Sequence, residues 1–294
     1  MSTAVDRRGV TSAATAFFIW GLSPLFFKAL AWLPATEIVS HRVVWSVLLL
    51  AGWLGFREGF GRIRAAFGQK RLLALLCVTT VLTACNWLLY VWAVVSGLTV
   101  EASLGYFINP LFYVAMGAML LGERLRRLQW FAVGLAAAGV VLRVIVLGHL
   151  PWVALAIAAT FGTYGILRKR APIDSVNGLF VETLIALPVA AGFLAWMANA
   201  GALHSPQTSW AWLLLPAAGV ITTVPLALFA EGARRLPLSV LGLLQYMAPT
   251  LQFLCAVVVF REPFGGGQLA SFALIWIGLA LYSWDALRNA GRVK

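Results

Sequence analysis

The chain contains 294 residues, of which 62% are hydrophobic and 11% are charged, and its mean hydropathy is +0.90. A water-soluble domain has about a quarter of its residues charged, so this composition excludes a soluble protein and predicts that most of the surface faces lipid. The formal net charge of +12 would also suit a nucleic-acid-binding protein, but the distribution of the basic residues described below assigns it to membrane topology, and no nucleic-acid partner is predicted.

Ten apolar segments are long enough to be membrane-spanning helices. About 20 mostly apolar residues are needed to cross a hydrocarbon core of about 30 Å, and a span must be helical because lipid offers no partners for free backbone N–H and C=O groups. Glycine, proline and charged residues separate the segments where turns are expected. The predicted spans cover about residues 10–32, 35–55, 72–95, 99–121, 128–147, 151–168, 175–198, 210–231, 238–260 and 267–287.

The basic residues gather on one side of these spans. When successive spans cross the membrane in alternate directions, 18 of the 22 Lys and Arg residues fall on the side that carries both chain termini. The remaining four, Lys28, Arg42, Arg143 and Arg261, lie within spans or near their opposite ends. Lys and Arg are enriched in cytoplasmic loops, so the chain is predicted to be a multi-pass membrane protein with both termini in the cytoplasm.

The two halves of the sequence repeat one pattern. Four residues of the first half recur 139 positions later; the pairs are Pro110 and Pro249, Glu123 and Glu262, Gln129 and Gln268, and Gly139 and Gly278. An offset of this length covers five spans, an odd number, so the second copy enters the membrane from the opposite side. The sequence therefore predicts an all-α protein of two inverted five-helix repeats, residues 1–148 and 149–294. Secondary transporters have this arrangement, with the substrate site near the midplane between the repeats.

No pattern of an enzyme or of a metal protein is present. The sequence contains no serine or cysteine nucleophile with a neighbouring base, no HExxH motif and no GxxxxGK[ST] motif, so neither catalysis, nor ATP-driven transport, nor a cofactor is predicted. Cys77, Cys85 and Cys255 all lie inside predicted spans, without further ligands at metal-binding spacing. They are interpreted as small buried hydrophobic residues.

Several stretches carry a family resemblance. They are Ala13–Pro24 (AATAFFIWGLSP), Glu37 with His41–Ser46, Asn86–Tyr90 with Trp92-Ala93, Glu101–Pro110 (EASLGYFINP) and Gly122–Trp130. Through them, nearly the whole chain resembles the EamA family of the drug/metabolite transporter superfamily, specifically its RarD type. The resemblance implies a ten-helix inner-membrane permease that exports small metabolites. Related exporters of the YddG type move aromatic and other hydrophobic amino acids, which are therefore the expected substrates.

Two other readings of the function remain open. One is a drug or nutrient permease with a different substrate or direction, and the other is a membrane-embedded enzyme or sensor. The expected partners are a small-molecule substrate and the lipid bilayer. The chain is expected to be a monomer, with a homodimer as the alternative.

Polar and aromatic residues inside the spans are the candidate substrate ligands, because such groups are rare in a bilayer and usually face a cavity or another helix. Asn86 and Tyr90 lie one turn apart on one helix face. The segment Glu101–Trp130 is expected to be a helix broken at Pro110, which frees a backbone carbonyl on the preceding turn, and to be closed by a charged turn. The full set is Trp20, Asn86, Tyr90, Tyr106, Asn109, Pro110, Tyr164, Gln245 and Pro249. The alternative for each is a role in helix packing.

Glu182 is a carboxylate in the interior of a predicted span. An unpaired ionised carboxylate there would be costly, so Glu182 is expected either to couple proton movement or to form a structural pair, with His41 or Arg42 as the partner. Glu37 and Glu101 begin helices and are expected to interact with the helix dipoles. Glu123 and Glu262 lie in charged turns, where pairing with arginine is expected.

Overall fold

A computed structural model of the chain describes residues 6–57, 59–121, 126–205, 208–236 and 238–289, and these residues form helices and no β-strand. In chain order the elements are α1 (Arg7–Ala29), α2 (Ala35–Arg57), α3 (Gly61–Gly68), α4 (Lys70–Val95), α5 (Thr99–Leu121), α6 (Arg127–Leu147), α7 (Trp152–Arg170), α8 (Ser175–Asn199), the 3-10 helix η1 (Ser209–Leu213), α9 (Leu214–Arg235), α10 (Leu238–Leu244), α11 (Met247–Leu254), the π-helical turn η2 (Cys255–Val259) and α12 (Gly266–Asn289).

The helices have the length and surface of a multi-span membrane protein. Within the described part of the chain, seven helical segments are long and apolar enough to cross a membrane, and α7 and α11 with η2 form shorter apolar helices. The outward surface carries large apolar side chains, such as Phe56, Ile145 and Val189, which are 94%, 71% and 77% exposed. A surface of this kind suits contact with lipid rather than water. The prediction of an all-helical polytopic membrane protein is therefore confirmed.

Local sequence explains where several helices begin and end. The Asp6 carboxylate accepts a hydrogen bond of 2.9 Å from the Arg8 backbone N–H and so caps α1. The Asp174 carboxylate caps α8 in the same way, with 3.0 Å to the Asn177 backbone N–H. At the other end of a helix, Gly148 adopts a left-handed conformation (φ 72°) that stops α6.

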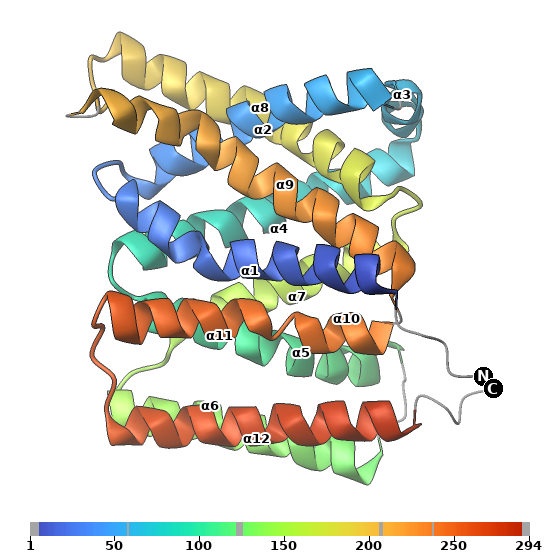
Figure 1. Cartoon of the computed structure of the whole chain (residues 1–294), viewed down its shortest axis with the longest axis vertical. Coiled ribbons are helices and arrows are strands. Elements are labelled where there is room, and N and C mark those ends of the chain that lie inside the picture. The colour runs from blue at the N-terminus through green and yellow to red at the C-terminus, as the bar shows by residue number, and fades with distance from the viewer. Residues whose placement is uncertain (1–5, 58, 122–125, 206–207, 237, 290–294) are drawn as a thin grey trace.

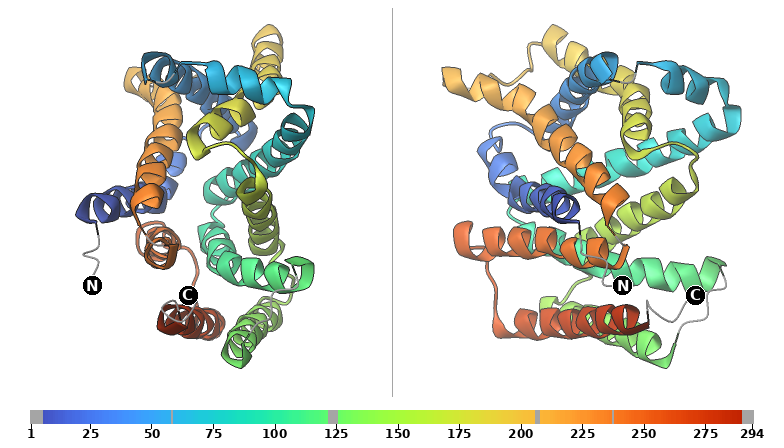
Figure 2. Two further views of the ribbon diagram at one scale, coloured as in Figure 1. Left: turned by 90° about the vertical axis from the view of Figure 1, so that its right-hand side faces the viewer. Right: turned by 45° about the vertical axis from the view of Figure 1, so that its right-hand side comes forward.

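The long helices lie side by side, and consecutive ones run in opposite directions (Figure 1). α1 begins and α12 ends at one end of the bundle, where α3 and the α7–α8 connection also lie. We call this the basic end, because the helices that begin or end there carry arginines at those ends: Arg62 in α3, Arg71 at the start of α4, and Arg168, Arg235 and Arg288 near the ends of α7, α9 and α12. α6 packs against α12 along one edge, α1 against α9 and α11, α5 against α7 and α11, and α2 against α8 and α9 (Figures 1 and 2).

Glycines allow α6 and α12 to approach each other closely. A Cβ atom on Gly139 of α6 would lie 2.8 Å from the Ser271 carbonyl oxygen of α12. On the other side of the same contact, a Cβ atom on Gly278 would lie 2.7 Å from the Ala132 carbonyl oxygen of α6. Small residues at such crossings are typical of helix packing in membranes, because they let the backbones meet.

The two proline-containing helices of the repeat differ from each other. α5 runs through Pro110 without interruption, so the expectation of a break there is wrong. The corresponding helix of the second half is interrupted at Gln245 and Tyr246, which separate α10 from α11. Pro249 has no N–H to donate to the Gln245 carbonyl, which accepts from the Ala248 N–H at 3.3 Å instead, so the backbone tightens at this point.

Two further details correct the sequence-based expectations. Residues Gly61–Gly68 form the short helix α3, with buried Ile63 and Ala66, in a stretch for which no helix was predicted. Glu262 does not pair with an arginine among the described residues. Its two carboxylate oxygens accept hydrogen bonds, both of 2.8 Å, from the backbone N–H groups of Thr99 and Val100, the first residues of α5. Its predicted counterpart Glu123 lies outside the described residues.

Candidate functional site

Polar side chains in the interior of the bundle form two clusters. The central cluster comprises Ser23, Arg42, Asn86, Trp87, Tyr90, Tyr106, Thr160 and Thr222, from α1, α2, α4, α5, α7 and α9. The Glu182 cluster comprises Thr79, Tyr164, Arg168 and Glu182, from α4, α7 and α8. The second cluster lies nearer the basic end, because Arg168 is close to the end of α7 and Glu182 is in the first part of α8.

Asn86 connects three helices at the centre of the first cluster. Its side-chain amide on α4 donates to the Ile157 carbonyl at 3.2 Å and lies 3.1 Å from the Thr160 hydroxyl, both on α7. Its amide oxygen accepts a hydrogen bond of 3.1 Å from the Tyr106 hydroxyl on α5. Asn86 is 2% exposed, so this network is held inside the protein. Two of the predicted site residues, Asn86 and Tyr106, are thus in direct contact.

Tyr90, one turn from Asn86 on α4, extends the cluster toward α1. Its hydroxyl lies 2.8 Å from the Ser23 Oγ atom. Its ring meets the rings of Phe27 and Tyr106 edge-on, with centroids 6.0 and 5.6 Å apart. Tyr90 therefore brings α1, α4 and α5 together, as expected if Asn86 and Tyr90 share one inward helix face.

Aromatic rings link the two clusters. The ring of Tyr106 contacts Phe161 on α7 at 5.6 Å between centroids, and Phe161 stacks on Tyr164 at 6.0 Å. Tyr164 then donates from its hydroxyl to the Glu182 carboxylate at 3.2 Å. A continuous row of aromatic side chains from Tyr90 to Tyr164 thus connects the two clusters, through the more exposed ring of Phe161. Ring contacts of this geometry are attractive and hold the side chains in defined positions.

Arg42 belongs to the central cluster and not to the Glu182 cluster. Its Nε donates to the Thr222 hydroxyl on α9 at 2.6 Å, and its guanidinium lies over the Trp87 ring at 4.1 Å from the centroid. The side chain is 7% exposed. The aromatic face partly compensates for the lost hydration of this cation. The expected pairing of Arg42 with Glu182 is not found.

Glu182 pairs with Arg168 instead, which corrects the prediction of His41 or Arg42 as its partner. The Arg168 Nε lies 3.5 Å from one carboxylate oxygen of Glu182, and the Thr79 hydroxyl donates to the same oxygen at 2.6 Å. Glu182 is 2% exposed, so Arg168 must extend from the end of α7 into the bundle. Gly178 makes room for it, because a Cβ atom there would clash with the Arg168 guanidinium.

Asp174, the residue just before α8, also contacts Arg168, from the basic end of the bundle. The Asp174 backbone carbonyl accepts a hydrogen bond of 3.3 Å from an Arg168 terminal nitrogen, and its carboxylate forms an ion pair with Arg62 at 3.2 Å. Partial burial favours the neutral Asp174 carboxyl, but hydrogen bonds from Asn177 and Arg62 outweigh it and hold the pKa of Asp174 below its ordinary value. The Arg168 guanidinium is thus held by α8 at two of its nitrogens, Nε and one terminal nitrogen.

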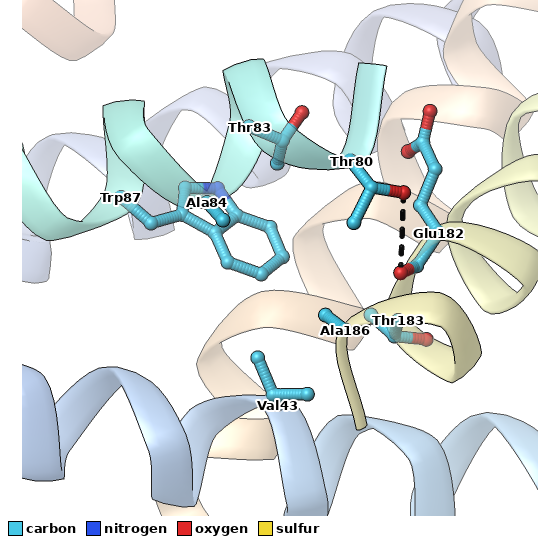
Figure 3. A pocket seen from close by; sticks show the side chains of 8 residues that line it. All are labelled: Val43, Thr80, Thr83, Ala84, Trp87, Glu182, Thr183 and Ala186. Atoms are coloured by element: carbon cyan, nitrogen blue, oxygen red, sulfur yellow. Dashed lines mark hydrogen bonds between the residues drawn. The ribbon is translucent and has the colours of Figure 1, made fainter. Parts of the chain in front are cut away.

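A small pocket lies beside the Glu182 cluster, between α2, α4 and α8 (Figure 3). Its volume is about 10 Å³, at the lower limit for one water molecule. Four apolar residues line it beside four polar ones: Val43, Ala84, Trp87 and Ala186, and Thr80, Thr83, Glu182 and Thr183. The pocket is too small for a metabolite in this conformation.

Trp20 takes part in the site through its backbone. Pro24 lacks the N–H that would bond the Trp20 carbonyl within α1, and two side chains take its place. Ser23 donates to this carbonyl at 2.7 Å, and Gln252 of α11 donates to it at 3.2 Å. The Trp20 ring packs at 5.8 Å on Phe229 of α9. Trp20 thus joins the central cluster through Ser23, and Gln252 links α11 to α1.

The predicted residues of α10 and α11 have different surroundings. Gln245 is partly exposed at the break between the two helices, and Pro249 is buried on α11. Neither makes a side-chain contact with the central cluster among the hydrogen bonds of the described residues. No hydrogen bond joins Gln245 or Pro249 to Tyr106 or Asn109 among the described residues, and their arrangement across one cavity stays a prediction.

Asn109 and Pro110 lie on α5 beside α7. Asn109 is 5% exposed, and its amide oxygen has no hydrogen-bond partner among the described residues. A Cβ atom on Gly162 of α7 would lie 3.1 Å from this oxygen, so the glycine leaves it space. A buried acceptor without a partner is costly and is often a point where water or a ligand binds.

His41 lies apart from both clusters. It is partly buried on α2 and interacts electrostatically with Glu37 one turn away. Glu37 is in the first turn of α2 and is 1% exposed, and its carboxylate is 2.9 Å from the His204 Nδ1 atom. The described residues contain no group of three or more His, Cys, Asp or Glu side chains that could hold a metal ion.

Sequence reasoning missed several residues of the two clusters. Ser23, Thr160 and Thr222 are short hydroxyl residues in apolar spans, and Trp87 lies beside the predicted Asn86. The signal for Ser23 was the proline that follows it. For Thr222 and Thr160 no pattern distinguishes a hydroxyl that bonds another helix from one that bonds its own backbone, and both do the latter as well.

Both halves of the chain match one known protein family. Residues 7–145 and 150–284 each match the EamA-like transporter family. An uncharacterized transporter of Pseudomonas aeruginosa is 46% identical over 298 residues, covering 100% of this chain and 99% of the relative. The protein RarD of Escherichia coli is 42% identical over 295 residues, covering 100% of both chains. One solved crystal structure aligns with a TM-score of 0.59 at 20% identity, covering 95% of this chain and 98% of the other, and this likeness concerns the fold alone.

Proposed function

Since the chain belongs to the EamA-like transporter family, of which RarD is a full-length relative, we propose that it is a secondary transporter that exports small hydrophobic metabolites across the inner membrane by alternating access. Aromatic and hydrophobic amino acids are the proposed substrates. The observation that carries the proposal is the central cluster, in which six helices place hydroxyl, amide and aromatic groups together inside an apolar bundle. Polar groups of this kind orient a ligand, and aromatic side chains accommodate its apolar part.

The proposed substrate ligands are the predicted residues closest to this cluster. Asn86, Tyr90 and Tyr106 supply the hydrogen-bonding groups, and Asn109 offers a buried acceptor without a partner among the described residues. Trp20 and Tyr164 lie at its two sides. We propose that Pro110, Gln245 and Pro249 act on the backbone, at the helix positions that change when the site opens.

The proposal includes two inverted repeats of five spans each, and reciprocal contacts support it. Gly139 meets Ser271, and Gly278 meets Ala132. Both the two glycines and their two contact residues are separated by 139 positions, as expected if one two-fold axis relates the halves. In the same way α1 packs on α9 and α11 of the second half, while its proposed counterpart α7 packs on α4 and α5 of the first.

We further propose that the basic end is cytoplasmic, which would place both termini inside the cell. The arginines at this end, among them Arg62, Arg71 and Arg235, support the assignment through the positive-inside rule. At the opposite end Trp152, Trp210 and Trp212 are 50%, 59% and 53% exposed, as suits an aromatic belt at the outer membrane surface.

Flux through liposomes tests the proposed function. Purified protein is reconstituted, the vesicles are loaded with radiolabelled phenylalanine or leucine, and efflux is compared with vesicles that lack protein. Efflux down the gradient is expected. Asn86→Ala should slow it at least about tenfold, because Asn86 joins three helices and a proposed ligand is lost. Asn199→Ala, at an exposed position at the end of α8, is the matched control and should leave efflux unchanged. If no labelled solute moves through correctly folded protein, the proposal is wrong.

A further inference from the structure

The buried charged residues of the bundle differ in whether a group of opposite charge lies beside them. Among the described residues that are buried, Glu182 pairs with Arg168, Asp285 with Arg126, and Glu37 with His204. Glu101 and Arg143 interact electrostatically with each other. Arg42, by contrast, has no carboxylate partner among the described residues.

The surroundings of Arg42 are neutral on every side that the structure describes. Its electrostatic neighbours are the hydroxyls of Tyr90 and Tyr106, from α4 and α5. Thr222 of α9 accepts from Nε, and the rings of Trp87 and Phe27 lie 4.1 and 5.6 Å from the guanidinium carbon. A cation that is 7% exposed in such a place lacks the anion that charged groups inside a membrane normally have.

Arg42 can be compared with Glu182, which has the same place in the corresponding helix of the second half but does have a charged partner. Arg42 is the eighth residue of α2, and Glu182 is the eighth residue of α8. Glu182 forms an ion pair with Arg168, so the negative charge of Glu182 is balanced. The buried charge of Arg42 is left for a group that the described part of the chain does not provide.

We infer that Arg42 binds the negatively charged group of the substrate, so that the transported solutes carry a carboxylate beside an apolar body. This inference rests on the transport function proposed above and names the chemistry of its site. Because Thr222 occupies Nε, the two terminal nitrogens are left to face a carboxylate, and the Trp87 ring holds the guanidinium plane in place. Arginine binds carboxylates through two parallel hydrogen bonds, which gives both strength and orientation. The apolar body would then lie against the rings of Tyr90 and Tyr106.

Equilibrium binding to the full-length protein in lipid nanodiscs tests the inference. The probes are radiolabelled phenylacetate, phenylalanine, phenylacetamide and phenethylamine, which share one ring but differ in charge. The wild-type protein should bind the two carboxylate-bearing probes at least about tenfold more tightly than the amide or the amine. Equal affinity for phenylacetate and phenylacetamide, or no binding of either carboxylate, would overturn the inference without the use of any variant.

Variants assign the preference to one side chain. Arg42→Gln should weaken phenylacetate binding at least about 30-fold, while its effect on phenylacetamide stays below about threefold. Arg42→Lys keeps the charge without the planar fork, so its affinity for phenylacetate should lie between those of the wild-type protein and Arg42→Gln. Arg143→Gln removes another buried arginine, on α6, and should leave phenylacetate affinity unchanged. Unchanged phenylacetate affinity in Arg42→Gln would contradict the assignment.

The flux assay separates this inference from the function on which it rests. If the carboxylates bind through Arg42 but no solute crosses the membrane, the transport proposal fails and the anion site stands. If solutes cross without any preference for carboxylates and without dependence on Arg42, transport stands and the anion site fails.

Discussion

The Glu182 carboxylate contacts three side chains. Their chemistry bears on whether Glu182 couples proton movement or forms a structural pair. Arg168 balances the charge at 3.5 Å, while the hydroxyls of Thr79 and Tyr164 donate to it at 2.6 and 3.2 Å. These donors satisfy the carboxylate oxygens inside the bundle and join them to two neighbouring helices. Such a group holds α4, α7 and α8 together, and we propose that its role is structural.

Glu182→Gln is therefore expected to destabilise the protein. The change leaves Arg168 without its anion inside the bundle, which should lower the free energy of unfolding by about 3 kcal/mol or more. The double variant Glu182→Gln/Arg168→Gln removes both charges and should be more stable than the single one, with a coupling energy of about 1–3 kcal/mol. Unfolding of the purified variants in detergent, by heat or denaturant, measures both values.

The same variants address proton coupling. The dependence of flux on pH should be the same in the wild-type protein and in any Glu182→Gln protein that remains folded. Loss of the pH dependence at unchanged stability would contradict the structural role and assign proton coupling to Glu182.

At this scale the sequence could predict which side chains face inward but not all of their partners. Asn86 and Tyr90 follow helical spacing on α4, and both contact Tyr106 of α5. The pairing of Glu182 with Arg168 could not be read in the same way, because Arg168 stands at the edge of its span. Its long side chain reaches inward only because Gly178, on another helix, leaves the space.

At the scale of helices, the start of α5 depends on a residue far along the chain. The backbone N–H groups of Thr99 and Val100 have no partners within α5, and the Glu262 carboxylate accepts from both at 2.8 Å. Arg261, with a left-handed φ of 55°, turns the chain just before Glu262. A negative group at a helix N-terminus is also favoured by the helix dipole.

Glu262→Ala should thus cost about 1–2 kcal/mol of unfolding free energy, because two N–H groups lose their acceptor. Glu262→Gln keeps one acceptor oxygen and should cost less. Glu231→Ala is the matched control, since this glutamate makes partly exposed ion pairs with Arg234 and Arg235 at the basic end and should leave stability nearly unchanged. If Glu262→Ala is as neutral as the control, the carboxylate does not cap α5.

The contact between α6 and α12 gives a second prediction for the elements. Gly139→Ala and Gly278→Ala should each lower the unfolding free energy by about 1–3 kcal/mol, because each new methyl group meets a backbone carbonyl of the facing helix. Gly134→Ala on α6, with no atom within 4 Å of the new methyl group, should be neutral or slightly stabilising. Thermal unfolding of the three variants compares them. Equal effects at all three glycines would contradict the close contact and its proposed two-fold relation.

The repeated prolines show that similar sequences in the two halves do not produce the same helix geometry. Pro110 and Pro249 occupy corresponding positions, yet α5 is continuous and the second helix is interrupted at Gln245 and Tyr246. A proline removes one hydrogen bond from any helix, but packing against neighbours decides whether the helix continues. Gly105 and Gly162 bring α5 and α7 into close contact around Pro110, and this contact is not written in the proline itself.

For the molecule as a whole, composition and charge were sufficient for the class of protein. Apart from α3 and the break between α10 and α11, the described helices begin and end within a few residues of the predicted spans, because the length of an apolar run is set by the membrane rather than by side-chain packing. The short helix α3 was missed because it is not an apolar span: it lies at the basic end with only Ile63 and Ala66 buried. Its position depends on contacts with α4 and α8.

The central claim is that one interior site is reached alternately from the two sides of the membrane. Ser23 lies in this site beside Tyr90, and Ser23→Cys is a small change there. In a protein with Cys77, Cys85 and Cys255 replaced by alanine, the new thiol can be labelled by a membrane-impermeant reagent applied from one side at a time.

Labelling of this cysteine is the most direct measurement. We expect reaction from each side in vesicles of known orientation, with an added substrate such as phenylalanine shifting the balance between the two. A thiol that reacts from one side only under every condition, or from neither side in protein that transports phenylalanine, would contradict alternating access at this site.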